Sequence, residues 1–335
     1  MKNVKSLCQN GIFQRLHLVL LGVFYMKSKV AIVKGEDRRG NICQALELIK
    51  QDVISKINSQ EIIVKPNCLQ SAVPLSCTHI DALRGILDFL KGLPTESVTV
   101  AETCRDSEPF ESFNRLGYTS LTDEYDVELN NPQEDNDWVD AYLLNRNDQD
   151  VKVKISRRLF ECKCRISAAV AKTHDTVTIT GAWKNMMGAL ALEDKVKMHG
   201  CNSHSERILI SEVEILPQNL IHIAQIVPPH ISVIDGFIGM EGEGPVQGTE
   251  KHLGIAIAST DFVSADAVCA KAMGFEPLEI SYLNYGNQMG LGVADLDDIE
   301  IIGEPVENVV NRFTPHSHYP TQMKWIELLS SLAVK

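Results

Sequence analysis

Lysine, histidine and asparagine side chains gather in one stretch of the sequence, AKTHDTVTITGAWKNMMGALALEDKVKMHG, at residues 171–200. Lys172 and His174 end an apolar, strand-like run, and Lys184 and Asn185 open an apolar helical pattern just after a glycine. A lysine and an asparagine at a helix N-terminus, with free backbone N–H groups, can receive an anion. We interpret the stretch as a site for a small anionic molecule. The alternative is a solvated loop around a core helix.

Two histidines in this stretch, His174 and His199, could move protons, because an imidazole titrates near neutral pH. Cys201 lies two residues beyond His199 and could act as a thiolate, although a buried structural cysteine is the simpler interpretation. We predict catalytic roles for His174, His199 and Lys184.

Polar residues also follow other strand-like segments. The five polar strand ends are Lys65 with Asn67, Glu102 with Thr103, Lys172 to Asp175, Asp235, and Ser259 to Asp261. The carboxyl ends of parallel strands meet at one edge of a sheet, where ligands bind. We therefore place Lys65, Asn67, Lys172 and Asn185 on the anion. The alternative for any single strand end is an ordinary polar turn.

A glycine-rich acidic loop, DGFIGMEGEGPVQGTE, occupies residues 235–250. Its spacing fits neither GxGxxG nor a Walker motif, and its carboxylates would repel phosphate. We predict an acidic lid whose glycines adopt positive φ and bend tightly over a pocket. Gly242 and Gly244 would then contact the substrate.

Three carboxylates, Asp235, Glu241 and Asp266, are candidate ligands for a divalent metal, or groups that orient the basic side chains. None of these three candidates lies in an HxH or HExxH spacing, so the ligands would have to assemble across the fold. We expect Asp235 near His174 or Lys184. The sequence does not identify a cofactor, and a divalent metal is the candidate.

The nine cysteines are odd in number, irregularly spaced and without a CxxC pair. The pattern provides no disulfide framework and indicates reduced thiols in a cytoplasmic protein. It also argues against an iron–sulfur cluster held wholly by this chain, because close cysteine runs are missing.

The composition of the 335-residue chain excludes some partners and leaves room for a sizeable core. Hydrophobic residues make up 44%, and the net charge is −12 without a dense Lys/Arg cluster, so nucleic acid is not an expected partner. The apolar run at residues 16–25 is about ten residues long and too short for a stable membrane span. We interpret residues 1–25 as an extra segment before a natural start at Met26. The alternative is an export or membrane-associating segment.

Short apolar strands alternate with helical patterns, which predicts an α/β fold with a mostly parallel, twisted sheet flanked by helices. We expect one domain over residues 26–335 with an inserted or appended smaller subdomain. The expected strands are 29–35, 61–67, 97–102, 127–129, 150–156, 165–174, 230–236 and 253–261. The expected helices are 41–57, 78–92 with Thr78 as N-cap, 183–192, 205–227 with Pro217 in a first turn, and 261–274.

Several motifs together resemble the domain of unknown function family 362. They are VKPN at residues 64–67, KTHDTVTITGAWKNMMGAL at 172–190, DGFIGMEGEGPVQG at 235–248, and the helix from Asp261 to Gly274. The resemblance covers about residues 29–275. The chain departs from the family at Ile80, where a proline is common.

The resemblance implies an α/β domain that often occurs in iron–sulfur proteins, although this chain has no ferredoxin-type cysteine run. No general reaction for the family follows from it. Three functions therefore stay open. The first is an enzyme acting on a small anion, the second a redox-linked accessory protein with a separate ferredoxin-type partner, and the third a binding protein without turnover.

Overall fold

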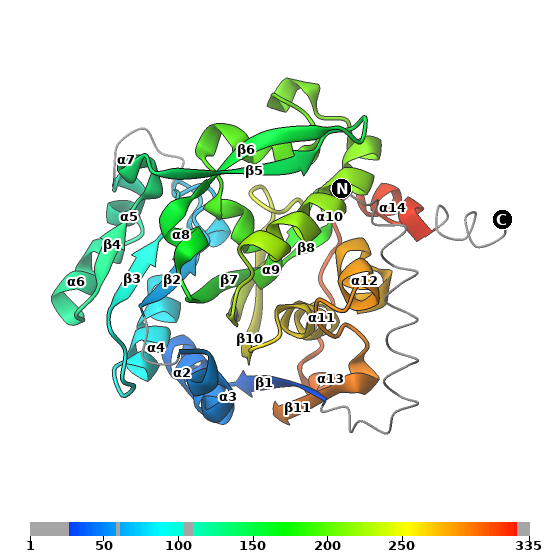
Figure 1. The fold of residues 1–335 in the computed structure, drawn as a ribbon. Helices are drawn as coiled ribbons and strands as arrows, with labels where there is room; N and C mark the ends of the chain where they lie inside the picture. The colour runs from blue at the N-terminus through cyan, green and yellow to red at the C-terminus, as the bar shows by residue number, and fades with distance from the viewer. Residues whose placement is uncertain (1–26, 58–60, 104–109, 327–335) are drawn as a thin grey trace, which may run out of the picture.

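The computed structural model describes residues 27–57, 61–103 and 110–326. A large central sheet runs through this part of the chain, in the strand order β11-β1-β10-β9-β7-β2-β3-β4, with β8 paired to β7 (Figure 1). Only β10 and β8 run antiparallel to their neighbours in it. The predicted mostly parallel α/β sheet is confirmed.

The strands of this sheet are short at its edges and long at its centre. They are β1 (Ser28–Lys34), β2 (Ile62–Pro66), β3 (Val98–Ala101), β4 (Glu128–Asn130), β7 (Cys164–His174), β8 (Thr178–Thr180), β9 (Ile231–Glu241), β10 (Thr249–Ser259) and β11 (Ile299–Gly303).

Side-chain alternation along the strands divides the interior into two cores, one on each face of the sheet. On β1, Ala31 and Val33 face one core, and Val30 and Ile32 face the other. The first core is covered by α2 (Arg38–Leu48), α3 (Lys50–Ile57) and α4 (Ile80–Leu90). The second is covered by α9 (Ala182–Asn185), α10 (Leu209–Ile226), α11 (Phe262–Ala272) and α12 (Ser281–Gln288).

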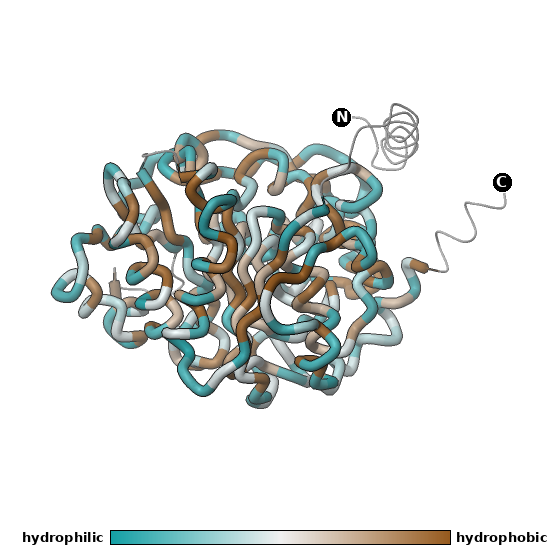
Figure 2. The backbone as a smooth tube through the Cα atoms, turned by 90° about the horizontal axis from the view of Figure 1, so that it is seen from below, coloured by the Kyte–Doolittle hydropathy of each residue, from teal (hydrophilic) through white to brown (hydrophobic). Residues whose placement is uncertain are grey.

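Shorter helical segments connect these elements. They are η1 (Pro74–Ser76), α5 (Glu111–Arg115), η2 (Tyr118–Ser120), α6 (Leu121–Glu124), α7 (Pro132–Asp135), α8 (Arg157–Glu161), η3 (Met186–Ala189), η4 (Leu192–His199), η5 (His204–Glu206), η6 (Pro277–Glu279), η7 (Leu296–Asp298), α13 (Val306–Val309) and α14 (Tyr319–Gln322). The tube view shows apolar segments running through the middle of the molecule, with polar turns around them (Figure 2).

A separate antiparallel ribbon, β5 (Trp138–Leu144) and β6 (Asp150–Ser156), is inserted between β4 and β7. It lies apart from the central sheet (Figure 1). Its inward residues, such as Leu143 and Ile155, nevertheless join the second core. The sequence predicted an inserted or appended subdomain without giving its position, so that prediction is not tested by the ribbon. The predicted boundary at residue 26 lies outside the described residues.

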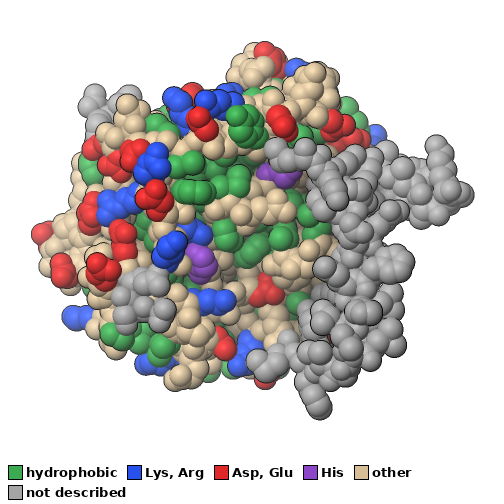
Figure 3. Space-filling view, in the orientation of Figure 1, with side chains coloured by type: hydrophobic (Ala, Val, Ile, Leu, Met, Phe, Trp, Pro, Cys, Tyr) green, Lys and Arg blue, Asp and Glu red, His purple; other side chains and the backbone are tan. Residues whose placement is uncertain are grey.

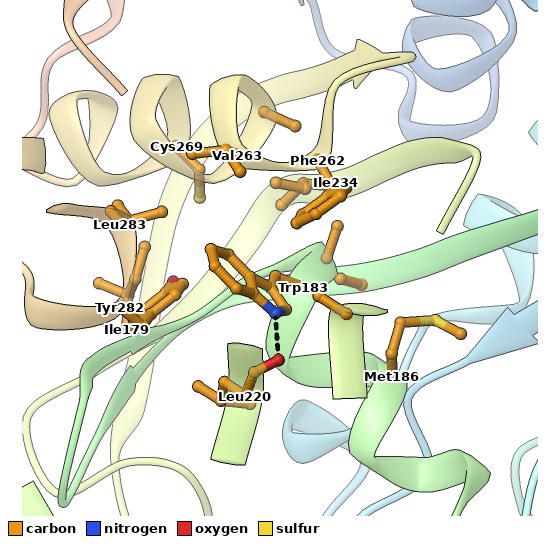
Figure 4. Packing of buried hydrophobic residues seen from close by; sticks show 14 of the residues in the cluster. Ile179, Trp183, Met186, Leu220, Ile234, Phe262, Val263, Cys269, Tyr282 and Leu283 are labelled. Carbon is orange, nitrogen blue, oxygen red and sulfur yellow. Dashed lines mark hydrogen bonds between the residues drawn. The ribbon is translucent and has the colours of Figure 1, made fainter. Parts of the chain in front are cut away.

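Trp183 fills the centre of the second core (Figure 4). Its ring meets Phe262 and Tyr282 edge-on, with ring centroids 5.0 and 5.2 Å away, and its Nε1 donates to the Leu220 carbonyl at 2.9 Å. A buried indole with its N–H satisfied gives both packing and orientation. These contacts anchor α9, the short helix that carries Lys184.

Asp266 holds the start of the same helix from α11. Its carboxylate accepts the backbone N–H groups of Ala182 (2.6 Å) and Trp183 (3.3 Å) and the hydroxyl of Tyr282 (3.1 Å). A side chain at Gly181 would collide with this carboxylate, so glycine is required there. Asp266 therefore positions a helix N-terminus.

Four helix predictions differ from the structure, of which three concern helix bounds, caps or type. The expected helix 41–57 begins at Arg38 and is divided at Ile49. His79 caps α4 in place of Thr78, because the Thr78 hydroxyl is used by the Ala168 carbonyl and the Asn67 N–H. The expected helix at 183–192 is one α-helical turn followed by a 3-10 turn.

Pro217 was expected in a first helical turn and lies inside α10, which continues through it. The apolar side chains on both sides of Pro217 are buried, and this packing offsets the missing N–H. Among the described residues, no helix combines the length and hydropathy needed to cross a membrane.

We expect Asp266→Ala to lower the free energy of unfolding by about 3 kcal/mol, because three buried donors lose their acceptor. Urea unfolding monitored by circular dichroism measures this change. The matched control is Asp37→Ala, which removes a more exposed helix cap that accepts one N–H and should cost about 1 kcal/mol. Equal losses in the two variants would contradict the role given to Asp266.

Candidate functional site

A cavity of about 540 Å³ lies where the carboxyl ends of β2, β3 and β7 meet. The segment from β8 to η4 forms one wall, the residues after β2 form another, and the loop from Glu243 to Gln247 forms a third. The predicted residues that line it are Asn67, Lys172, His174, Lys184, Asn185, His199 and Gly244. The structure thus brings together most of the predicted catalytic and substrate-binding side chains.

Three of the five polar strand ends converge and two do not. β2, β3 and β7 run parallel, so their polar ends share one edge of the sheet. Asp235 lies inside β9, which continues to Glu241, and is not at a strand end. β10 runs antiparallel to its neighbours, so Asp261 lies beyond the opposite edge and caps α11.

Lys65 lies behind the cavity wall and is fully buried. Its ammonium forms an ion pair with Glu102 and donates to Asn185 Oδ1 (3.1 Å) and to the Pro66 carbonyl (3.1 Å). A side chain at Gly188 would collide with this ammonium and with Glu102. All three ammonium protons therefore have acceptors, so Lys65 supports the wall.

Lys172 is also buried and already has partners. Its ammonium donates to Asn67 Oδ1 and to the Ser76 carbonyl (2.6 Å). Burial lowers the pKa of Lys172 to about 8, although the nearby Cys77 and Cys68 thiols oppose the shift. Lys172 thus places at the cavity edge an ammonium group that loses its proton more readily than an ordinary lysine does.

Lys184 differs from these two lysines. It is 7% exposed, and its ammonium contacts the sulfur of Met187 at 3.3 Å. Among the described residues, no carboxylate oxygen lies within 4 Å of it. Burial lowers its pKa to about 7, and the neighbouring cations Lys172 and Arg207 act in the same direction, against Asp175. A buried cation without a counter-ion is energetically unfavourable, and an anion would neutralise it.

His174 ends β7 with a neutral ring. Burial lowers its pKa to about 3, and Lys184 acts in the same direction. Its Nδ1 accepts the backbone N–H of Thr176 at 3.0 Å, which assigns the ring proton to Nε2. Asp175 Oδ1 also lies 3.0 Å from Nδ1, but the better partners of this carboxylate are Arg207 (2.9 Å) and the Thr176 hydroxyl (2.9 Å).

His199 has the opposite arrangement. Its Nδ1 lies 2.9 Å from Glu212 Oε2, so Nδ1 donates and Nε2 keeps a lone pair. Arg207 holds the same carboxylate at 2.6 Å, and burial lowers the pKa of His199. Despite burial, the hydrogen bonds from His199 and Arg207 lower the pKa of Glu212 to about 2. Glu212 therefore orients His199 as an ionised carboxylate.

The glycine-rich segment is a hairpin between β9 and β10, whose connecting loop lines the cavity. Of its five glycines, only Gly242 has a positive φ, of 74°, so the expectation of positive φ is wrong for the others. Gly244 lies so close to Thr173 that a side chain there would collide with the Thr173 carbonyl. The glycines let the loop approach β7, and its role as a lid stays a prediction.

The three predicted metal ligands are not brought together. Asp235 lies on the face covered by α2 and pairs with Arg38 at 3.2 Å, Glu241 accepts the Thr314 N–H at 2.8 Å, and Asp266 caps α9. None of the three lines the cavity, so Asp235 does not face the basic stretch. Nor do the described residues contain any group of three His, Cys, Asp or Glu side chains arranged for a metal.

Sequence reasoning assigned no site role to several polar residues around the cavity. Lys195 donates to the Thr103 carbonyl at 2.7 Å, and Thr180 has a buried hydroxyl without a hydrogen-bond partner among the described residues. Arg207 and Glu212, which contact each other, lie in segments that contain no recognisable sequence motif. The spacing of Arg207 and Glu212 from His199 matches no known motif, so their contacts with His199 could be found only from the fold.

The surface in Figure 3 shows positive and negative side chains interspersed on the visible face. This face carries no continuous basic patch of the kind that binds nucleic acid.

Two comparisons with individual proteins return one distant relative and one solved structure of limited similarity. The thylakoid-associated protein sll1697 of Synechocystis sp. (strain ATCC 27184 / PCC 6803 / Kazusa) is 23% identical over 161 residues, which cover 48% of each chain. The chain therefore matches about half the length of this curated relative. The lactate racemase apoprotein from Thermoanaerobacterium thermosaccharolyticum aligns with a TM-score of 0.49 and 12% identity, over 74% of this chain and 58% of that one.

A family model matches a larger part of the chain. The match extends over residues 62–271, which include β2, β3, β7 and the hairpin that surround the cavity, as well as α11 up to Lys271. The resemblance drawn from the motifs is thereby confirmed. The chain belongs to the family described as domain of unknown function, DUF362.

Proposed function

We propose that this protein is an enzyme that acts on a small anionic substrate in the cavity at the ends of β2, β3 and β7. The observation that carries the proposal is the Lys184 ammonium, which is buried, lines the cavity and has no carboxylate within 4 Å among the described residues. A buried charge of this kind is costly unless a ligand neutralises it.

The other cavity cations support Lys184 as the anion-binding group, because each of them already has oxygen partners in the protein. Lys195 contacts Glu102 at 3.5 Å, and Arg207 is held between Asp175 and Glu212. Lys172 uses two of its protons on oxygens of Asn67 and Ser76. An incoming anion therefore finds its free partner at Lys184.

Two further donors suit the same anion. The Thr180 hydroxyl lines the cavity, is buried and lacks a partner among the described residues. His174 has its ring proton on Nε2, the nitrogen not used by the backbone. Thr180, His174 and Lys184 could together bind one oxyanion, such as a carboxylate or a phosphate.

His174 and His199 would supply the chemistry, because their proton states are complementary. His199 presents a lone pair on Nε2, oriented by Glu212, and can accept a proton from the substrate. His174 presents an N–H donor that can stabilise negative charge as it develops on the substrate. Such a pair suits proton transfer at a carbon or oxygen beside the anionic group.

A divalent metal forms no part of this proposal, because the carboxylates predicted to hold it are committed elsewhere in the fold. A binding protein without turnover would use the same cavity. Incubation of the protein with a panel of small carboxylates and phosphate esters, followed by mass spectrometry, separates the two. Conversion of one compound that is lost in His199→Ala indicates an enzyme, and binding of a compound without conversion indicates the alternative.

We expect sulfate, used as a probe anion, to raise the melting temperature of the wild type, and Lys184→Met to abolish this rise. His174→Gln should weaken the rise, because one donor to the anion changes position. The matched control is Lys197→Met. Lys197 pairs with Asp194 at 2.7 Å and does not line the cavity. A sulfate response in Lys184→Met that equals that of the wild type would refute the assigned anion site.

Sulfate affinity should also depend on pH. The pKa of Lys184 is lowered to about 7, so its ammonium is present below that pH and is lost above it. We expect affinity to fall by up to about tenfold per pH unit above about pH 7, with proton uptake on binding. Isothermal titration calorimetry in buffers of different ionisation enthalpy measures both quantities. Affinity that stays constant from about pH 6 to about pH 8.5 would contradict this assignment.

A further inference from the structure

Two cysteines lie directly opposite each other beside the cavity. Cys68 and Cys77 form an isolated antiparallel bridge that closes the segment between β2 and α4. One residue outward, the Thr78 N–H donates to the Asn67 carbonyl at 2.8 Å. The cysteines therefore occupy a non-hydrogen-bonded pair, in which Cα atoms are about 4.5 Å apart. That separation lies within the range that a disulfide can bridge.

The two side chains already touch. The Cys77 thiol forms a hydrogen bond with the Cys68 thiol, and both residues are buried, at 3% and 4% exposure. This hydrogen bond, together with burial, raises the pKa of Cys77, while Ser76 and the Lys172 ammonium act in the opposite direction. The Lys172 cation beside the two thiols offsets part of this rise, because a positive charge stabilises a thiolate.

A small reagent in the cavity can reach the cysteine pair, and a disulfide formed there would restrain the neighbouring cavity wall. Cys68 lines the cavity, although most of its surface is buried. The residues next to the pair, Asn67 and Ser76, supply the two oxygens that hold the Lys172 ammonium. A covalent link between the cysteines would therefore fix the cavity wall that carries Lys172.

We propose that Cys68 and Cys77 are a dithiol site that exchanges with small-molecule disulfides and closes to an intramolecular disulfide in the cavity wall. The Cys68 thiolate attacks a disulfide RSSR, forms a mixed disulfide and releases one thiolate. The Cys77 thiolate then attacks the Cys68 sulfur and releases the second. The cysteines are oxidised, RSSR is reduced, and the two cysteine protons leave with two RSH molecules.

The other described cysteines lack this arrangement. Cys162 donates to the carbonyl of Cys164, so its thiol is directed at the backbone, and Cys269 contacts the sulfur of Met273.

The test treats purified, reduced full-length protein with glutathione disulfide at neutral pH and then alkylates the remaining thiols under denaturing conditions without reduction. Cys68 and Cys77 lie on one tryptic peptide, because no other cleavable Lys or Arg falls between Lys56 and Arg84. We expect this peptide to lose two hydrogens and to escape alkylation, with full recovery after dithiothreitol. The melting temperature of the oxidised protein should rise by roughly 5 °C.

Cys68→Ser and Cys77→Ser should each prevent the intramolecular bond, and Cys162→Ser, the matched control, should leave it unchanged. The wild-type peptide mass decides the question even if a variant folds poorly. Full alkylation of both cysteines, a mixed disulfide that persists on Cys68, or a bond of either cysteine to another partner would overturn the proposal.

Discussion

The fully buried ammonium of Lys65 is the constraint on which the rest of the site depends. A charge in the interior is tolerated only when each of its protons finds an acceptor. Lys65 meets this condition with the Glu102 carboxylate, the Asn185 side chain and a backbone carbonyl. These contacts join β2, β3 and α9, and they require glycine at position 188. The cavity wall is therefore built around one satisfied charge.

Several other charged side chains around the cavity are also paired with one another. Glu102 is held by Lys65 and also contacts Lys195, while Asp175 and Glu212 are held by Arg207. These cavity-side carboxylates are therefore engaged by other cations, and none of them lies within 4 Å of Lys184. An acidic protein thus presents a locally unmatched positive charge. The two neutral histidines beside it differ only in which ring nitrogen carries the proton.

The sequence predicts the fold class and much of the site because both depend on local patterns. Apolar strands alternating with amphipathic helices predict the parallel sheet, and polar residues after β2 and β7 predict the cavity edge. Asp235 and Asp266 were misplaced because a carboxylate within an apolar segment has the same local pattern whether it meets a metal, an arginine or a helix N-terminus. Arg207 and Glu212 could not be predicted, since their roles arise from contacts that only the tertiary fold creates.

The antiparallel direction of β10 was equally hidden, because the predicted strands end at residue 236 and begin again at residue 253. The short loop between Glu241 and Thr249, which indicates a hairpin, was therefore not recognised. It removes Asp261 from the site and leaves the three parallel strand ends to form it.

The most direct measurement of the central claim is a crystal structure of the protein soaked in selenate, with data collected at the selenium absorption edge. We expect an anomalous peak in the cavity beside Lys184 Nζ, within hydrogen-bond distance of Thr180 Oγ1, that is absent in crystals of Lys184→Met. A cavity without a peak, or a peak that remains in Lys184→Met, would contradict the claim that Lys184 anchors an anion.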